Sequence, residues 1–144
     1  MRLSTEPSPA LAFLDAGPLI ALADRGDPRH EASRAYFARA GSRLVTHVGV
    51  LAEVVTFVRY RFGHPAARRI GDGVRAGLGV DLLPIDLADE REGWRWFLRY
   101  RDQRFSLVDC WSFAIMERLG IREVVTFDHH FAVAGFNPVL PVAT

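Results

Sequence analysis

A chain of 144 residues, 49% of them hydrophobic, is long enough to bury a core and short enough to form one domain. The net charge of +1 predicts little overall attraction to polyanions, and all 18 basic residues are arginine, which excludes a mechanism that needs a catalytic lysine. The single cysteine, Cys110, excludes an internal disulfide framework and a cysteine-based zinc cluster.

Residues 1–10 contain Pro and Ser but lack the apolar stretch of a signal peptide. No apolar run in the sequence approaches the roughly 18–20 residues that a transmembrane helix needs. We therefore expect a cytoplasmic protein without membrane contacts, in which residues 1–10 form a flexible tail. Residues 11–144 are expected to form a single domain.

Short apolar segments alternate along the chain with segments of helical periodicity. In chain order they predict a strand at 10–14, helices at 19–23 and 30–40, a strand at 43–46, helices at 48–62 and 66–76, a strand at 80–84, helices at 86–101 and 107–119, and strands at 122–126 and 137–141. Asp86 or Asp89 is expected to cap the fifth helix, and Gly120 to end the sixth. This alternation predicts an α/β domain with a mainly parallel sheet of four to five strands.

Four acidic side chains fall where strands and helices of such a fold meet. Asp15 directly follows the first strand, and Asp128 follows the fourth. Asp109 lies in the first turn of the last predicted helix, and Glu53 lies in the first half of the third. In parallel α/β folds the ends of strands and the starts of the following helices face the same sheet edge, where ligands bind. The four carboxylates are therefore expected to converge.

Convergence of four carboxylates requires a counter-charge. Two like unit charges about 4 Å apart repel by roughly 1 kcal/mol in water and by about 4 kcal/mol at an effective dielectric constant of about 20. Hard oxygen ligands suit Mg²⁺ or Mn²⁺, and one or two such ions can hold a phosphodiester and activate a water molecule. The residues themselves thus point to a divalent metal ion and a phosphate-containing substrate.

Each acid also has a purely structural alternative. Asp15 can cap the helix that follows it, and Asp109 can form a capping box with Ser106. Glu53 lies at the border of the apolar arc of its helix and can be a solvated residue. Asp128 can be an ordinary turn residue. The spacing alone leaves these alternatives open.

Four segments, in this order, resemble the motifs of the PIN-domain nucleases, in particular the VapC-like toxins of toxin–antitoxin pairs. The segments are 13–20, 46–53, 105–110 and 125–131, and they carry Asp15, Glu53, Asp109 and Asp128 respectively. The resemblance extends over nearly all of the chain from Phe13 to Phe136. It departs from the family pattern at Ala16, where members often have Thr or Ser, so that a hydroxyl contact near the metal is lost.

The resemblance implies a three-layer α/β/α sandwich with the activity of a Mg²⁺- or Mn²⁺-dependent endoribonuclease. Asp15 and Asp109 would be the principal metal ligands, and the other two acids would complete the catalytic cluster. Two hydroxyl residues, Ser106 and Thr126, would orient carboxylates or a substrate phosphate. Hydrolysis would leave a 5′-phosphate and a 3′-hydroxyl.

The resemblance also implies partners. An RNA would be the substrate, a cognate antitoxin protein would hold the toxin inactive, and a homodimer would form through the apolar early helices. The alternative is a catalytically degenerate PIN domain that serves as a protein-binding scaffold. The retention of all four acids argues against that alternative.

Other polar and aromatic residues fit none of the four motifs. His129 and His130 are predicted to lie in an extended segment, where adjacent side chains point in opposite directions, so that at most one reaches the acids. The aromatic residues at 94–100 are predicted to belong mainly to the core rather than to a base-stacking surface. Arginines at 59–69 are compatible with a phosphate-holding surface or a solvated face. Asp102 is predicted to be a surface-loop residue.

Overall fold

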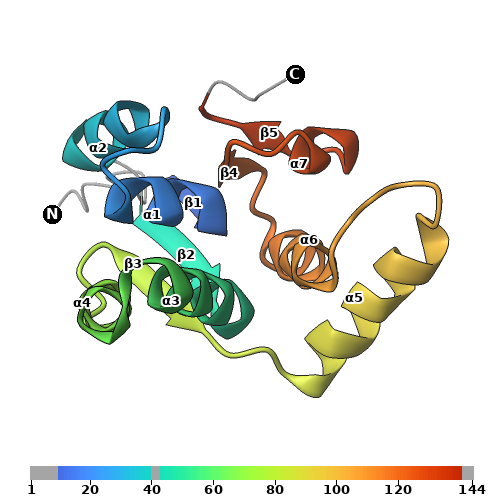
Figure 1. The fold of residues 1–144 in the computed structure, drawn as a ribbon. Coiled ribbons are helices and arrows are strands. Elements are labelled where there is room, and N and C mark those ends of the chain that lie inside the picture. Colours follow the sequence, from blue (N-terminus) through green and yellow to red (C-terminus); the bar gives the residue numbers. More distant parts are fainter. Residues whose placement is uncertain (1–9, 40–42, 141–144) are drawn as a thin grey trace, which may run out of the picture.

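The computed structural model describes residues 10–39 and 43–140, and nearly all of the tail predicted at 1–10 lies outside these ranges. A five-stranded sheet lies at the centre of the described chain (Figure 1). Its strands are β1 (Leu11–Leu14), β2 (Arg43–His47), β3 (Val80–Leu83), β4 (Glu123–Val125) and β5 (Asn137–Pro138). They run in the order β3-β2-β1-β4-β5, and every neighbouring pair is parallel. The predicted α/β class and parallel sheet are confirmed.

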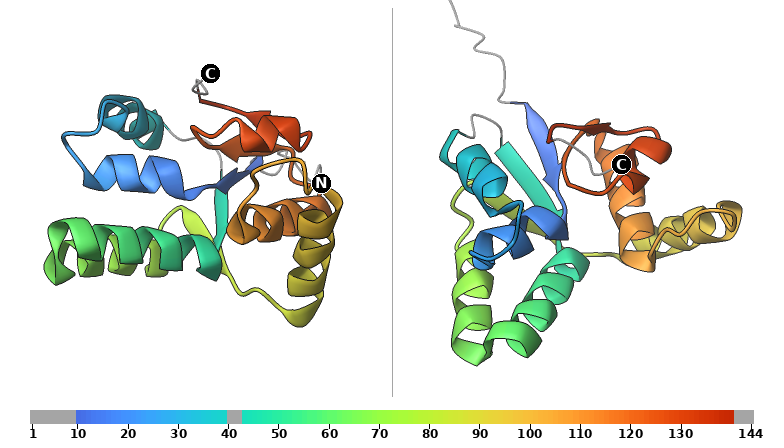
Figure 2. Two further views of the ribbon diagram at one scale, coloured as in Figure 1. Left: turned by 45° about the vertical axis from the view of Figure 1, so that its right-hand side comes forward. Right: turned by 45° about the horizontal axis from the view of Figure 1, so that its top comes forward.

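Helices cover both faces of the sheet and complete three layers (Figure 2). One face carries α1 (Ala16–Ala23), α2 (His30–Arg39), α3 (Val48–Phe62) and α4 (His64–Arg75). The other face carries α6 (Leu107–Leu119) and α7 (His130–Val133), with α5 (Leu87–Arg99) packed on the outer side of α6. The α/β/α sandwich implied by the resemblance is therefore confirmed. None of the described helices is long and apolar enough to cross a membrane.

The order in which the chain adds strands to the sheet reverses between β1 and β4, although all strands remain parallel. The chain moves outward from β1 through β2 to β3, and then returns across the sheet to place β4 on the other side of β1. Crossovers between parallel strands are right-handed, so this reversal also moves the connecting helices to the opposite face. The segments that follow β1 and β4 consequently part in opposite directions, and a crevice opens between them at the carboxyl edge of the sheet.

The two strands beside this crevice are buried on both faces. The side chains of Phe13, Leu14, Val124 and Val125 are all fully buried in the core. A parallel sheet covered on both faces favours continuous apolar runs over alternating ones. The strands therefore hold the following polar residues on a rigid support.

Most element boundaries lie within a few residues of their predicted positions. The helix predicted from residue 66 begins at His64, and the helix predicted to reach residue 101 ends at Arg99. Asp86 caps α5 by accepting a hydrogen bond of 2.8 Å from the backbone N–H of Asp89. Gly120 ends α6 in the left-handed conformation, with φ of 68°.

A buried histidine caps α3 and ties it to α6. Nδ1 of His47 accepts hydrogen bonds from the backbone N–H groups of Gly49 at 3.0 Å and Val50 at 3.3 Å. Burial lowers the pKa of His47 to about 4, so the ring is neutral at physiological pH and carries its hydrogen on Nε2. Nε2 then donates to Oγ of Ser112, 2.8 Å away.

The aromatic residues of α5 divide between core and surface. Trp96 and Tyr100 stack on each other, with ring centroids 5.3 Å apart, and pack against the core. Trp94 and Phe97 stack with centroids 5.0 Å apart but are 45% and 41% exposed. The prediction of a core role therefore holds only for the first pair, because α5 is an outer helix that contacts the core along one face.

Close packing and an ion pair between the half-exposed Arg118 and the buried Asp89 hold α5 against α6. A Cβ atom at Gly93 would lie 2.5 Å from Cδ1 of Trp111, so the two helices approach each other only because this position is glycine. Asp89 is only 3% exposed. Nε of Arg118 donates to Asp89 Oδ1 at 2.7 Å, and its Nη2 donates to Oδ2 at 3.0 Å.

Replacing Arg118 with Met is expected to lower the free energy of unfolding by on the order of 3 kcal/mol, because it leaves the buried Asp89 carboxylate without its counter-charge. Urea unfolding measures the loss. A matched control, Arg95→Met, removes an exposed pair with Glu92 at 3.0 Å and should cost less than about 1 kcal/mol. Equal losses in the two variants would contradict the role given to burial.

Candidate active site

All four predicted acids line one cleft at the carboxyl edge of the sheet. Asp15 follows β1 directly, and Asp128 lies in the segment between β4 and α7. Asp109 is in the first turn of α6, and Glu53 is exposed at the side of α3. The cleft has a volume of about 390 Å³, and its walls include the four acids together with Arg29, Phe127 and His129.

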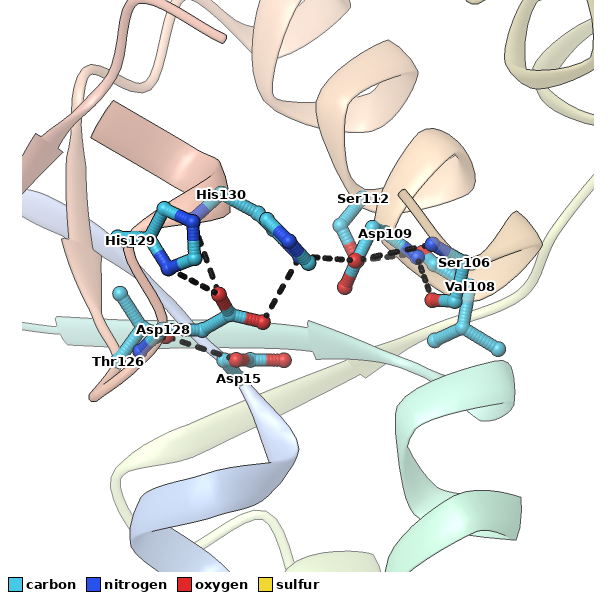
Figure 3. A network of polar contacts seen from close by, with 9 residues as sticks. All are labelled: Asp15, Ser106, Val108, Asp109, Ser112, Thr126, Asp128, His129 and His130. Atoms are coloured by element: carbon cyan, nitrogen blue, oxygen red, sulfur yellow. Dashed lines mark hydrogen bonds and ion pairs between the residues drawn. The ribbon is translucent and has the colours of Figure 1, made fainter. Parts of the chain in front are cut away.

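Asp15 is held rigidly at the centre of this arrangement. It is 7% exposed, and its backbone N–H donates to the carbonyl of Val125 at 3.1 Å, which extends the β1–β4 pairing by one residue. Its side chain forms no capping bond with α1, although the residue occupies the capping position. Instead, Oδ2 of Asp15 accepts a hydrogen bond of 2.8 Å from Oγ1 of Thr126 (Figure 3). The carboxylate is thus aimed into the cleft rather than at the helix.

Thr126 connects two of the acids. Its hydroxyl donates to Asp15 and accepts a hydrogen bond of 2.9 Å from the backbone N–H of Asp128. The side chain is completely buried, so neither bond competes with water. One hydroxyl therefore sets the position of both acids at the ends of the neighbouring strands β1 and β4.

Replacing Thr126 with Val is expected to weaken Mn²⁺ binding by about 10- to 100-fold, because the Asp15 carboxylate loses the hydroxyl that orients it. Isothermal titration calorimetry measures the affinity. The control is Thr126→Ser, which keeps the hydroxyl and should bind Mn²⁺ within a few-fold of the parent. Equal affinity in the Val variant would show that Thr126 does not position the acid.

Asp109 forms the capping box that its spacing allowed and also lines the acidic cleft. Ser106 and Asp109 form a capping box, in which Oγ of Ser106 accepts from the N–H of Asp109 at 3.0 Å and Asp109 Oδ2 accepts from the N–H of Ser106 at 3.1 Å. The same Asp109 side chain lines the acidic cleft and is only 9% exposed. The cap fixes the rotamer of the carboxylate and so supports its place in the cleft. Ser106 thereby orients one acid as Thr126 orients another.

The two histidines after Asp128 lie differently from the prediction. The segment is helical rather than extended, since His129 has φ of −67° and ψ of −15° and His130 begins α7. Both rings therefore lie beside Asp128 (Figure 3). Nδ1 of His130 is 3.2 Å from Asp128 Oδ2 and 3.3 Å from Asp109 Oδ2, and Nδ1 of His129 is 3.7 Å from Asp128 Oδ1. His130 thus bridges two acids, a contact that the sequence prediction missed.

The cleft concentrates negative charge. The pKa of Asp15 is raised from 3.8 to about 7, mainly by burial, with a smaller contribution from the charges of Asp109 and Glu53 and an opposing effect of the Thr126 bond. Burial also raises the pKa of Asp109. The pKa of Glu53, whose side chain is exposed but partly desolvated by the cleft wall, is raised by that desolvation and by the charges of Asp109 and Asp128. Within residues 10–39 and 43–140, no arginine forms an ion pair with any of the four acids. Among the described residues, the acids are therefore not neutralised by an arginine ion pair, although Arg29 lines the same cleft and His129 and His130 lie beside Asp128.

This donor set fits a divalent cation. Carboxylate oxygens are the ligands that Mg²⁺ and Mn²⁺ prefer, and a cation would offset both the burial that raises the pKa of Asp15 and the repulsion that adds to it. A second group, formed by Asp128, His129 and His130, offers ligand atoms that all lie within 4.8 Å of one another. Imidazole suits transition metals better than Mg²⁺. The carboxylates thus suit either ion, and of these two ions the histidines suit Mn²⁺ better than Mg²⁺.

The arginines predicted as a possible phosphate surface lie elsewhere. Arg59 and Arg68 border a separate groove between α3 and α4, with a volume of about 550 Å³. Arg61 lies 3.8 Å from Asp24. The arginine that does line the acidic cleft is Arg29, to which no motif pointed.

The parallel sheet, with an acidic cleft beside the ends of β1 and β4, agrees with the comparison to known families. Residues 12–137 match the family model of the PIN domain, and this range includes all four acids. The chain therefore belongs to the PIN-domain family.

Among curated relatives, a 23S rRNA-specific endonuclease of Mycobacterium tuberculosis, VapC20, is 32% identical over 131 residues, covering 91% of this chain and 99% of the relative. Ribonuclease VapC26 of the same organism is 27% identical over 121 residues, covering 83% of this chain and 89% of the relative. The crystal structure of VapC20, described as a sarcin–ricin loop cleaving toxin, superposes with a TM-score of 0.85 at 31% identity and covers 92% of this chain and all of that one. A toxin–antitoxin complex from Klebsiella pneumoniae shares the fold, with a TM-score of 0.64 at 17% identity. The match covers 92% of this chain and 99% of that one.

Proposed function

We propose that the protein is a metal-dependent endoribonuclease and the toxin of a toxin–antitoxin pair. The observation that supports this most directly is the convergence of Asp15, Glu53, Asp109 and Asp128 on one cleft, in which no described arginine forms an ion pair with any of them. Repulsion among four nearby carboxylates lowers the stability of the folded protein unless the cluster binds a cation. The similarity to VapC20 and VapC26, both named as ribonucleases, supports RNA as the substrate.

The four acids have distinct tasks in this proposal. Asp15 and Asp109, the two most buried, would hold Mg²⁺ or Mn²⁺, and Glu53 and Asp128 would complete the set directly or through water. A bound divalent ion supplies positive charge that neutralises the scissile phosphate and makes a water molecule more acidic. The protein's own part is orientation: Thr126 holds Asp15, and the capping box holds Asp109.

Ribosomal RNA is the substrate class that we propose. VapC20 is named as specific for 23S rRNA and its structure as that of a sarcin–ricin loop cleaving toxin. The match with that protein covers 99% of the relative and 91% of this chain. Because this RNA is cytoplasmic, we propose the same location for the protein.

An antitoxin and a second copy of the chain are the proposed protein partners. The VapC20 structure is described as that of a toxin, and the Klebsiella pneumoniae structure that shares the fold is a toxin–antitoxin complex, which supports an antitoxin partner. For the homodimer, α3 displays the large apolar side chains of Phe57, Tyr60 and Phe62, which are 41%, 86% and 43% exposed. Light scattering measures the oligomeric state of the parent chain and of a Tyr60→Ser variant with an altered α3 surface, and so tests the proposed homodimer.

The experiment that tests the activity is incubation of purified protein with intact ribosomes and with total RNA in the presence of Mn²⁺. We expect discrete cleavage of 23S rRNA that is lost in EDTA and in the Asp109→Asn variant. The matched control is Asp102→Asn, an exposed loop aspartate outside the cleft, which should cleave like the parent. Absence of cleavage together with absence of Mn²⁺ binding would favour the scaffold alternative.

A further inference from the structure

Arg29 lies in the turn between α1 and α2 and contributes the only arginine to the wall of the acidic cleft, among the residues that the structure describes. Its distance from the four motifs in the sequence gave no reason to single it out. The fold brings it to the cleft because α1 begins directly after Asp15 and the chain then turns back over the segment that follows β4.

Two neighbours hold the Arg29 side chain in place. Its guanidinium carbon lies over the ring of Phe127, 5.1 Å from the centroid, and Phe127 directly precedes Asp128. Its Nε donates to Asp27 Oδ1 at 3.3 Å, and the same oxygen accepts the backbone N–H of Arg29 at 2.8 Å. A guanidinium stacked on a ring and bonded through Nε has little rotational freedom left.

The outer edge of the guanidinium remains available. Neither terminal nitrogen of Arg29 has a partner within the described ranges 10–39 and 43–140, and the side chain is 49% exposed. Arg29 also forms no ion pair with the acids of the cleft, since its one salt bridge is to Asp27. Asp27 and Phe127 thus keep a positive charge beside the acidic cluster without letting it occupy the place of a metal ion.

A charge in this position has a use in RNA cleavage. The cleft is lined by four carboxylates, which repel the phosphates on either side of the scissile bond as much as the scissile phosphate itself. Two free N–H donors of one planar guanidinium match the geometry of two phosphate oxygens. An arginine at the edge of the cleft can therefore hold a neighbouring phosphate while the metal site holds the reacting one.

We propose that Arg29 binds a backbone phosphate of the RNA next to the bond that is cut, with Asp27 and Phe127 as its positioning residues. This assignment rests on the proposed ribonuclease function and adds a substrate-binding group to it. It makes the turn between α1 and α2 part of the RNA-binding surface.

The test compares Arg29→Gln with Arg25→Gln, a matched control in the same turn whose exposed side chain does not line the cleft. Both are made in the full-length chain carrying Asp109→Asn, so that a fluorescent RNA hairpin with the sarcin–ricin loop sequence is bound but not cut. The affinity is measured with Mn²⁺ at several salt concentrations. We expect Arg29→Gln to bind about tenfold more weakly and to reduce the slope of log K against log salt by about 0.7–0.9, the amount for one phosphate contact.

The control and a conservative variant separate this role from a structural one. Arg25→Gln should keep the parent slope, and Arg29→Lys should keep most of the slope because it retains the charge. A lower melting temperature in Arg29→Gln with an unchanged salt slope would overturn the assignment and leave Arg29 a purely structural residue. If the parent chain fails to bind the hairpin or any ribosomal RNA, the proposed function itself fails; if the parent binds and Arg29→Gln binds equally well, only the Arg29 assignment fails.

Discussion

Replacing Asp15 with Asn is expected to reduce RNA cleavage by about three orders of magnitude or more and, at the same time, to stabilise the metal-free protein. The loss of activity follows because Asn keeps the shape of the side chain and removes the charge that binds the ion. The gain in stability follows because burial raises the pKa of Asp15 to about 7, which makes the ionised form unfavourable in the folded state. A residue kept for the fold alone would not show opposite effects on activity and stability.

The stability effect has a defined pH dependence. The folded-state pKa of Asp15 lies above the unfolded value of 3.8, so the folded state binds the proton more tightly. Its favourable contribution is complete below about pH 4 and is lost as the pH rises through about 7. The advantage of Asp15→Asn should therefore be small near pH 4 and should grow to on the order of 2–4 kcal/mol at pH 8. Asn can still accept the hydrogen bond from Thr126.

Thermal melting in EDTA at pH 5 and pH 8 measures this effect, and Asp102→Asn serves as the control for loss of one surface charge. The melting temperature of Asp15→Asn should exceed that of the parent by more at pH 8 than at pH 5. A variant that melts below the parent at both pH values would show that the Asp15 carboxylate stabilises the fold. In that case burial would not destabilise the ionised Asp15 carboxylate at the centre of the site.

Addition of Mn²⁺ is expected to raise the melting temperature of the parent protein by roughly 5–10 °C when the free ion is present at about 100 times its dissociation constant. Such an excess stabilises the folded state by about 2.7 kcal/mol, because the unfolded chain does not assemble the four acids. The increase should be larger at pH 8 than at pH 5.5, since protons compete with the ion for carboxylates whose pKa values are raised.

Variants identify the donors that bind this ion. Asp15→Asn should abolish the increase in melting temperature, whereas His129→Ala should retain most of it. The reverse result, with the increase lost in His129→Ala and kept in Asp15→Asn, would place the ion at the Asp128–His129–His130 group. An unchanged melting temperature in the parent over a wide range of Mn²⁺ would contradict the presence of a working metal site.

The place of the acids could be predicted from the sequence because it depends on a simple feature of parallel sheets. Asp15 and Asp128 follow strands that pair directly, and the starts of α3 and α6 face the same edge as the ends of those strands. Apolar runs and the residues after them are enough to identify such positions. The three-layer arrangement followed from the family resemblance and agrees with the structure.

Contacts that depend on local backbone conformation or on tertiary packing could not be predicted in this way. His130 reaches Asp109 because the chain turns into a helix immediately after Asp128, and neither the spacing nor the residue types distinguish that turn from an extended segment. Arg29 reaches the cleft only through its packing on Phe127, nearly 100 residues later in the chain. Similarly, the periodicity of α5 could not show that Trp94 faces outward, since an outer helix and a core helix have the same spacing.

The chemical identity of the RNA ends tests most directly whether the acidic cleft is the catalytic centre. Purified protein with Mn²⁺ should produce fragments with a 5′-phosphate and a 3′-hydroxyl, because water activated beside the acids attacks the phosphorus and the 3′ oxygen leaves. Ligation assays before and after phosphatase treatment distinguish these ends from the alternatives. Fragments with a 2′,3′-cyclic phosphate and a 5′-hydroxyl would show that the ribose 2′-hydroxyl attacks instead. That result would contradict the account, since His129 and His130, rather than the four acids, would then be the natural proton-transfer groups.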